Sequence, residues 1–172
     1  GYVKSAPSRQ VAMVIDPPDG QIPPMTARGQ EPRAAARAAR RPLAEGPEDL
    51  SSWVRCITRS LVQTPGVYNN GFQVLQGPGY IAMQVEMLHE TRVIPTDPRP
   101  HLGPDITSWR GDARGRWEGD TLVVDTTNFL RETSFRNSSK NLHLTERLQR
   151  LSEDSLLYTF TVTDPTTWIQ PW

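Results

Sequence analysis

After residue 64, apolar and polar residues alternate along most of the chain, and the alternation is clearest near its end. In residues 142–149 the large apolar residues fall on every second position, and the same holds for residues 156–163. A period of two is typical of a β-strand with one buried face. We therefore predict an antiparallel hairpin joined by residues 152–155, with four side chains toward the core: Leu144, Leu148, Tyr158 and Phe160.

The same pattern predicts further strands at residues 72–75, 80–88 and 91–94. Residues 95–104 are rich in proline, which indicates a structured loop rather than a strand. Residues 117–125 combine an aromatic residue, a Gly-Asp turn and a β-branched run. We predict that they form one half of a hairpin whose partner is residues 108–112.

The N-terminal third has a different pattern. Residues 11–15 are predicted to form a strand that ends at a turn over residues 16–20. Residues 32–41 are rich in alanine and arginine and predict a helix on the surface. Residues 50–61 carry apolar residues at helical spacing, which predicts a second short helix with Cys56 beside its packed face.

These elements predict a mainly β fold with one or two short helices in the N-terminal third. About six to nine short strands in series form an antiparallel meander that either closes into a calycin-like barrel or folds as a sandwich. We expect a single β-rich domain over residues 1–172, with an extended and helical part in residues 1–63 and the meander in residues 64–172.

Composition narrows the choice of partners. The chain has 172 residues, and its 19 basic residues balance its 19 acidic ones, so no net charge attracts nucleic acid or an anionic membrane. Its apolar runs are too short to span a bilayer. We expect a small-molecule ligand as the partner and leave an oligomer open.

Cys56 is the only cysteine, so it cannot form a disulfide within this chain. We predict a buried free thiol, and the alternative is one half of a bridge to a cysteine outside the chain. The sequence begins at Gly1, with neither a methionine nor a basic and apolar leader before it. We expect either that a targeting segment has been removed or that the sequence is a fragment.

Local catalytic motifs such as a phosphate-binding glycine loop, a nucleophile elbow or a paired-cysteine motif are absent from the sequence. Candidates for acid–base catalysis are therefore scattered histidine and aspartate residues: His89, His101, His143, Asp97 and Asp112. Their spacing does not support a metal site, so we predict none and leave the cofactor unknown. The alternative is that each histidine is an ordinary surface or hydrogen-bonded loop residue.

Candidates for ligand binding gather around the predicted hairpin: Arg92, Trp109, Arg114, Arg116 and Trp117. Guanidinium groups bind carboxylates or phosphates, and indoles stack on flat rings. We expect the loop at 95–104 and this hairpin to form one wall of a pocket, with His101 and Arg116 exposed to a common cavity. The alternative is a charged hairpin in which Arg116 pairs with Asp112 or Glu118.

Residues 110–129 read Arg-Gly-Asp-Ala-Arg-Gly-Arg-Trp-Glu-Gly-Asp-Thr-Leu-Val-Val-Asp-Thr-Thr-Asn-Phe. With residues 92–101, 142–147 and 164–168, this text resembles a family of exported bacterial proteins of unknown function. The resemblance covers most of the chain after Cys56. It implies a signal peptide in the precursor and a periplasmic or extracellular location, but no activity.

The members of this family continue past the position of residue 172 into a segment with a second cysteine, a histidine and a glutamate. The resemblance thus implies a partner for Cys56 in that segment. Members of the family have glycine where this sequence has Pro98.

Three functions follow as hypotheses. The first is an exported protein that binds a small polar or aromatic ligand in a β-barrel or sandwich pocket. The second is a hydrolase or lyase that uses the histidine and aspartate residues, with or without a metal. The third is a structural subunit of a cell-envelope assembly, with the proline-rich N-terminal third as its contact arm.

Overall fold

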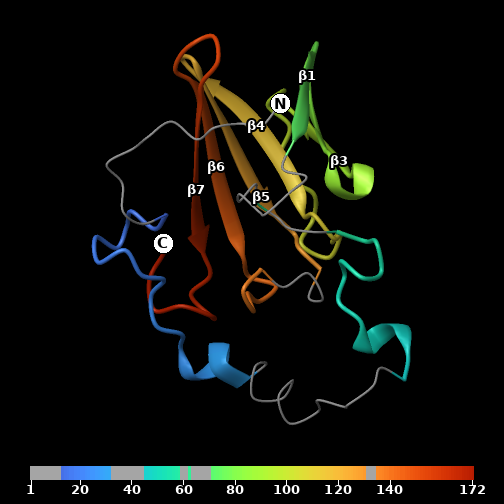
Figure 1. Cartoon of the computed structure of the whole chain (residues 1–172), viewed down its shortest axis with the longest axis vertical. Helices are drawn as coiled ribbons and strands as arrows, with labels where there is room; N and C mark the ends of the chain where they lie inside the picture. The colour runs from blue at the N-terminus through green and yellow to red at the C-terminus, as the bar shows by residue number, and fades with distance from the viewer. Residues whose placement is uncertain (1–12, 32–44, 59–61, 63–70, 131–134) are drawn as a thin grey trace.

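Seven strands form two antiparallel sheets in the part of the chain that the structure describes, residues 13–31, 45–58, 62, 71–130 and 135–172 of the computed structural model (Figure 1). The first sheet has the order β1-β2-β3 and the second the order β4-β5-β6-β7, so each strand pairs with its neighbour in sequence. The strands are β1 (Phe72–Gly77), β2 (Tyr80–Val85), β3 (Thr91–Pro95), β4 (Asp112–Glu118), β5 (Thr121–Thr127), β6 (His143–Arg150) and β7 (Leu156–Thr163). The prediction of a mainly β meander is confirmed, and these strands do not close into a barrel.

The two sheets face each other across an apolar core. Ile81, Met83 and Ile94 from the first sheet pack against side chains of the second, which are Ala113, Leu122, Val124 and Leu148. The C-terminal hairpin has the predicted register, since β6 pairs with β7 from His143 opposite Thr163 to Arg150 opposite Leu156. Leu144 and Leu148 are buried, while Tyr158 and Phe160 are half-buried against the core, so the predicted core side is confirmed.

A second core cluster joins the C-terminal segment to the described part of the N-terminal third. Trp168, Phe129 and Leu142 are among its buried members, and Ile22 and Met25 pack against them. Met25 also forms an isolated antiparallel bridge with Trp168. Ile22 and Met25 therefore pack this part of the N-terminal third against the domain.

A layer of buried polar side chains separates the two apolar clusters. Glu146 is 1 % exposed and lies on β6 between Leu144 and Leu148, and Arg92 is 8 % exposed on β3. The Arg92 guanidinium forms an ion pair with Glu146 and donates a hydrogen bond of 2.6 Å to Thr126 Oγ1. Buried charges cost several kcal/mol each unless they are paired, so the two charges depend on each other.

The hairpin formed by β4 and β5 differs from the predicted one in its first strand. The partner of β5 is Asp112–Glu118 rather than residues 108–112, and Gly119 (φ 60°) and Asp120 form the connection. The inward-facing positions at the start of β4 are the small residues Ala113 and Gly115, which hid the strand from an apolar pattern. A Cβ atom on Gly115 would lie 3.0 Å from the Ile94 side chain, so the opposite sheet leaves little space for a larger residue there.

The strand predicted at residues 80–88 ends earlier than expected. β2 stops at Val85, and Met87–His89 form the short 3-10 helix η2, in which Leu88 (φ 61°) and His89 (φ 52°) have left-handed backbone angles. The Val85 amide donates to the Glu90 carbonyl, which closes a tight loop before β3. Pro95 still belongs to β3, and residues 96–107 contain no strand, so the loop predicted at 95–104 is confirmed from residue 96 onward.

The predicted helix over residues 50–61 is wrong for its described part. Pro47–Asp49 form the 3-10 helix η1, and residues 52–57 form turns and bends. The Arg55 amide donates to the Ser51 carbonyl four residues back, but the Ile57 and Thr58 amides both donate to the Ser52 carbonyl, five and six residues back, which interrupts a helical ladder. Cys56 is exposed with φ 54°, so the predicted burial of its thiol is wrong as well.

Of the other N-terminal predictions, the turn at residues 16–20 is confirmed by the hydrogen bond from the Gly20 amide to the Pro17 carbonyl. Residues 13–15 are not in a strand, so the described part of the strand predicted at 11–15 is wrong. The predicted helix over residues 32–41 lies outside the described residues, and residues 27–31 are helical.

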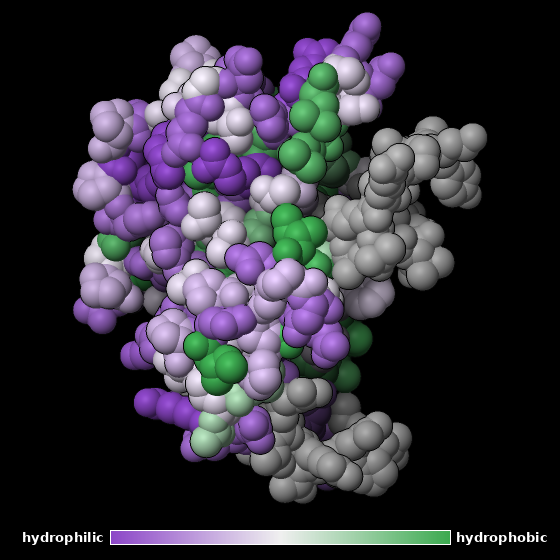
Figure 2. All heavy atoms as spheres, turned by 90° about the vertical axis from the view of Figure 1, so that its left-hand side faces the viewer, coloured by the Kyte–Doolittle hydropathy of each residue, from purple (hydrophilic) through white to green (hydrophobic). Residues whose placement is uncertain are grey.

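The face shown in Figure 2 is mainly hydrophilic, with apolar residues in small separate groups. Among the described residues, the structure contains no helix with the length and apolar character needed to cross a membrane.

Candidate functional site

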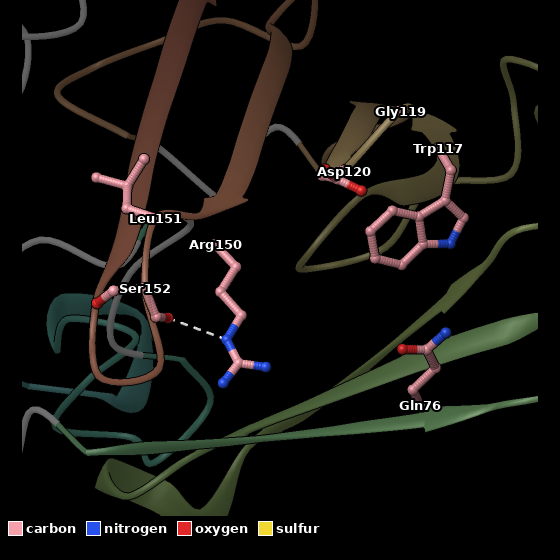
Figure 3. Close-up of a pocket in the computed structure, with 7 residues that line it drawn as sticks. All are labelled: Gln76, Trp117, Gly119, Asp120, Arg150, Leu151 and Ser152. Atoms are coloured by element: carbon pink, nitrogen blue, oxygen red, sulfur yellow. Dashed lines mark hydrogen bonds between the residues drawn. The ribbon is translucent and has the colours of Figure 1, made fainter.

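An open hollow lies at one end of the two facing sheets (Figure 3). Its volume is about 610 Å³. The connection between β4 and β5, the end of β6 and strand β1 all contribute to its lining, which consists of Gln76, Trp117, Gly119, Asp120, Arg150, Leu151 and Ser152. Residues of the second sheet and Gln76 of the first thus line one open space.

Trp117 supplies the aromatic surface of the hollow. Along β4 it alternates onto the same face as the buried Ala113 and Gly115. Its side chain is nevertheless 49 % exposed, because this end of β4 extends into the hollow. In Figure 3 the indole and the Gln76 amide lie on the same side of the hollow, facing Arg150. The exposed ring leaves apolar area in contact with water and is accessible for stacking.

Arg150 brings a positive charge into the hollow. Its Nε donates to the Ser152 carbonyl at 3.0 Å and its Nη2 donates to the Glu153 carbonyl at 3.3 Å. Within the described part of the chain, Arg150 forms no ion pair with a carboxylate. The guanidinium is therefore oriented by backbone oxygens and keeps its charge available to a ligand.

The outer face of the second sheet carries a dense ion-pair network. Arg116 pairs with Glu118 at 2.9 Å and with Asp125, and Arg147 also pairs with Glu118 at 2.9 Å. His143 Nε2 lies 3.2 Å from Asp125 Oδ1. These groups balance one another across the strands, which is the expected behaviour of a charged sheet face.

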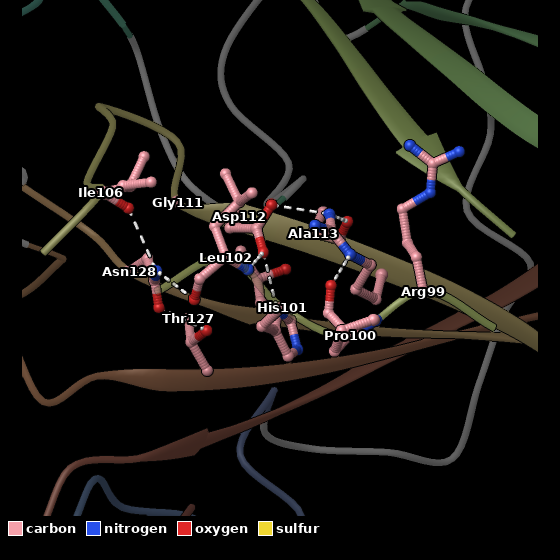
Figure 4. Close-up of polar contacts among 12 residues, drawn as sticks. Arg99, Pro100, His101, Leu102, Ile106, Gly111, Asp112, Ala113, Thr127 and Asn128 are labelled. Carbon is pink, nitrogen blue, oxygen red and sulfur yellow. Dashed lines mark hydrogen bonds and ion pairs between the residues drawn. The ribbon is translucent and has the colours of Figure 1, made fainter. Parts of the chain in front are cut away.

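His101 and Asp112 form a second cluster at the start of β4 (Figure 4). His101 Nδ1 lies 2.9 Å from Asp112 Oδ2, and the same oxygen accepts the Leu102 amide at 2.9 Å. Arg114 pairs with the other oxygen at 2.6 Å. If Nδ1 carries the proton, Nε2 is the acceptor, which is the arrangement that a general base requires.

Asn128 fixes the loop that carries His101. It has a left-handed backbone (φ 58°), and its side-chain amide donates to the carbonyls of Leu102, Gly103 and Ile106 at 3.2, 2.9 and 3.1 Å. Figure 4 shows this amide beside the loop. The loop is therefore held at two points, by Asp112 and by Asn128.

Burial raises the pKa of the Asp112 carboxyl, but the hydrogen bonds from the Leu102 amide and the His101 ring, with the charge of Arg114, outweigh it and hold the pKa below its ordinary value of 3.8. Burial also raises the pKa of Asp125, and hydrogen bonds from Arg116, Thr145 and His143 outweigh it there. Both carboxylates are thus ionised at neutral pH.

A pH prediction follows for Asp112. A carboxyl whose pKa is lower in the folded state stabilises the fold above its unfolded pKa, near 4, and this contribution is lost as the pH falls through the folded pKa. We expect Asp112→Asn to make the free energy of unfolding depend less on pH between 6 and 3, as measured by urea denaturation. Asp105→Asn, an exposed change in the same loop, is the control. A wild-type pH slope in Asp112→Asn would contradict the prediction.

No family model, curated protein or solved structure matches this chain. Among the described residues, no group of three or more histidine, cysteine, aspartate or glutamate side chains is arranged to hold a metal ion.

The structure separates the five predicted ligand-binding residues. Arg92 is buried between the sheets, and Trp109 is half-buried outside the lining of the hollow. Arg114 and Arg116 lie on the outer face with their carboxylate partners. Trp117 alone of the five lines the hollow.

Of the five predicted catalytic residues, the structure brings His101 and Asp112 together and separates the other three. His89 is exposed on η2, and Asp97 pairs with Arg99 two residues away. His101 and His143 each contact a different aspartate. His101, through Asp112, lies on the same sheet face as Arg116, but neither lines the hollow. Arg116 pairs with Glu118, one of the two partners that the charged-hairpin alternative named, and also with Asp125.

Sequence reasoning missed Asp120, Arg150 and Gln76. Each lies at or next to the end of a strand, beside a turn. The one sequence feature that could have indicated the site is that Asp120 and Arg150 lie at the ends of neighbouring hairpins. Turns at one end of a meander lie together, so charged residues in such turns come close in space.

Proposed function

We propose that this protein binds a small molecule with a flat aromatic ring in the hollow between its two sheets. The single observation that carries the proposal is the half-exposed indole of Trp117, which faces the hollow from the inner side of β4. Stacking an aromatic ring on the indole removes apolar area of both partners from water and adds the attraction between their π-systems.

Two further features support the proposal. The volume of about 610 Å³ is of the size that small-molecule sites have in proteins. Arg150 offers a guanidinium without a carboxylate partner among the described residues, which suits a carboxylate on the ligand. Histidine is absent from the lining, which favours binding over catalysis by the histidines considered above.

The two sheets act in this proposal as an open sandwich whose end admits the ligand, rather than as a closed calycin-like barrel. We further infer that the protein is an exported bacterial protein of the periplasm or cell exterior, on the resemblance of residues 110–129 to exported proteins. Immunodetection in cell fractions of the source bacterium tests this location, and a cytoplasmic signal alone would contradict it.

The binding test compares phenylacetate with cyclohexylacetate, which share a carboxylate and differ in the flatness and π-system of the ring. We expect phenylacetate to bind about 2- to 10-fold more tightly in calorimetric titrations, the range that aromatic stacking gives. Trp117→Ala should remove this preference. Trp53→Ala is the matched control, because Trp53 is 46 % exposed outside the hollow.

Equal affinity for the two acids, or a preference that survives in Trp117→Ala, would contradict the proposed function. Circular dichroism of each variant establishes that it is folded before titration. Because Trp117 is half-exposed, its replacement should change stability far less than the loss of a buried tryptophan.

A further inference from the structure

We infer that the ligand of the hollow carries a positive and a negative charge beside its aromatic ring, as an aromatic amino acid does. This inference rests on the proposed function and names the class of molecule that the hollow selects. It comes from two oppositely charged side chains that line the same hollow and do not pair with each other: Asp120 and Arg150.

The strand register makes this absence of pairing informative. Thr121 on β5 is the partner of Gln149 on β6, so Asp120 and Arg150 are the next residues along these two strands. Side chains at such neighbouring positions are within reach of each other. No ion pair joins them within the described residues, and Arg150 is instead held by the Ser152 and Glu153 carbonyls.

Figure 3 shows how the groups lie. The Asp120 carboxylate points toward the Trp117 indole, while the Arg150 guanidinium points away from Asp120 to another part of the hollow. The indole thus has an anionic group on one side, and a cationic group lies across the hollow from it.

The outer face of the same sheet behaves differently. There Glu118, Asp125 and Asp112 each contact at least one arginine. On this outer face opposite charges pair, whereas Asp120 and Arg150 in the hollow stay apart. A ligand with an ammonium and a carboxylate would complete both groups, the ammonium at Asp120 and the carboxylate at Arg150.

The test uses three compounds that differ by one group. Phenylalanine carries both charges, 3-phenylpropanoate lacks the ammonium, and phenethylamine lacks the carboxylate. We expect phenylalanine to bind the wild-type protein about three- to tenfold more tightly than either of the others, since exposed ion pairs contribute modestly. Calorimetric or NMR titration measures the three dissociation constants.

Two variants assign each charge to its partner. Asp120→Asn should lower the affinity for phenylalanine to that for 3-phenylpropanoate and leave 3-phenylpropanoate binding unchanged. Arg150→Gln should lower the affinity for phenylalanine to the affinity for phenethylamine and leave the binding of phenethylamine unchanged. Both residues are exposed, so neither change should unfold the protein.

The outcomes separate this inference from the proposed function. If 3-phenylpropanoate binds as tightly as phenylalanine and Trp117→Ala weakens both, the hollow takes aromatic anions, and only the inference about two charges is overturned. If phenethylamine binds as tightly as phenylalanine, the inference about two charges is likewise overturned. If none of the three compounds nor phenylacetate binds, the proposed function is overturned too.

Discussion

Glu146→Gln is expected to lower the free energy of unfolding by about 3 to 5 kcal/mol, the cost of leaving one buried charge without its partner. The substitution keeps the volume of the side chain, and the amide oxygen could still accept the hydrogen bond that the Tyr158 hydroxyl gives to Glu146 Oε1 at 2.8 Å. It would remove the negative charge that compensates Arg92. Urea denaturation followed by circular dichroism measures the change.

The double variant Arg92→Met with Glu146→Leu is the matched control. It removes both charges and fills the space with apolar groups that continue the two neighbouring core clusters. We expect it to be more stable than Glu146→Gln, within about 1 to 2 kcal/mol of the wild type. If the double variant were no more stable than the single one, the ion pair would not be what links the two positions.

Asp164→Ala is expected to destabilise the protein by about 4 kcal/mol or more, because several donors, those of Thr167 buried and those of Ser139 and Thr166 half-buried, lose one acceptor at once. Asp164 is 2 % exposed and follows β7. Its carboxylate accepts the Ser139 amide at 2.6 Å, the Ser139 hydroxyl at 3.0 Å and the Thr167 hydroxyl at 2.7 Å, as well as the Thr166 and Thr167 amides.

Asp164 holds the turn beneath Trp168 to the loop before β6, so its loss should loosen the second core cluster. Asp154→Ala is the control, since Asp154 is exposed in the turn between β6 and β7 and should change stability by less than about 0.5 kcal/mol. Thermal and urea unfolding of both variants test the expectation. Equal stabilities would mean that the carboxylate network has little weight.

The C-terminal hairpin was predictable because large apolar residues alternate with polar ones on both strands, so one face had to be buried. β4 was not, because its buried positions carry Ala113 and Gly115 in place of large apolar residues. The turn at residues 50–58 was mistaken for a helix because its apolar spacing is helical, although Trp53 and Val54 are exposed. Apolar spacing carries no sign of the left-handed backbone at Cys56, which is incompatible with a continuous helix.

The buried ion pair could be recognised in the sequence, because both charges stand at positions where the alternating pattern expects an apolar residue. Arg92 shares a face of β3 with Ile94, and Glu146 lies between Leu144 and Leu148 on β6. A charge at an apolar position of one strand, with the opposite charge at such a position of another, predicts a buried pair rather than a ligand contact. The alternating pattern does not predict which strands pack against each other, because that depends on how the two sheets come together.

Trp117 was predicted as a ligand contact, whereas the groups around it were not. Its neighbours Gln76 and Arg150 come from strands about 40 and 30 residues away in the sequence, so only the assembled sheets bring them together. The arginines next to Trp117 in sequence point to the other face of the sheet, because successive residues of a strand alternate.

The most direct test of the central claim is to see which tryptophan a ligand touches. The chain has five tryptophans, and each gives its own indole N–H signal in a two-dimensional ¹⁵N–¹H NMR spectrum. The Trp117 signal is assigned as the one missing from Trp117→Phe. Upon addition of phenylacetate or phenylalanine, this signal is expected to shift progressively while that of the buried Trp168 stays in place. A Trp117 signal that does not move, while another tryptophan signal does, would contradict binding in the hollow.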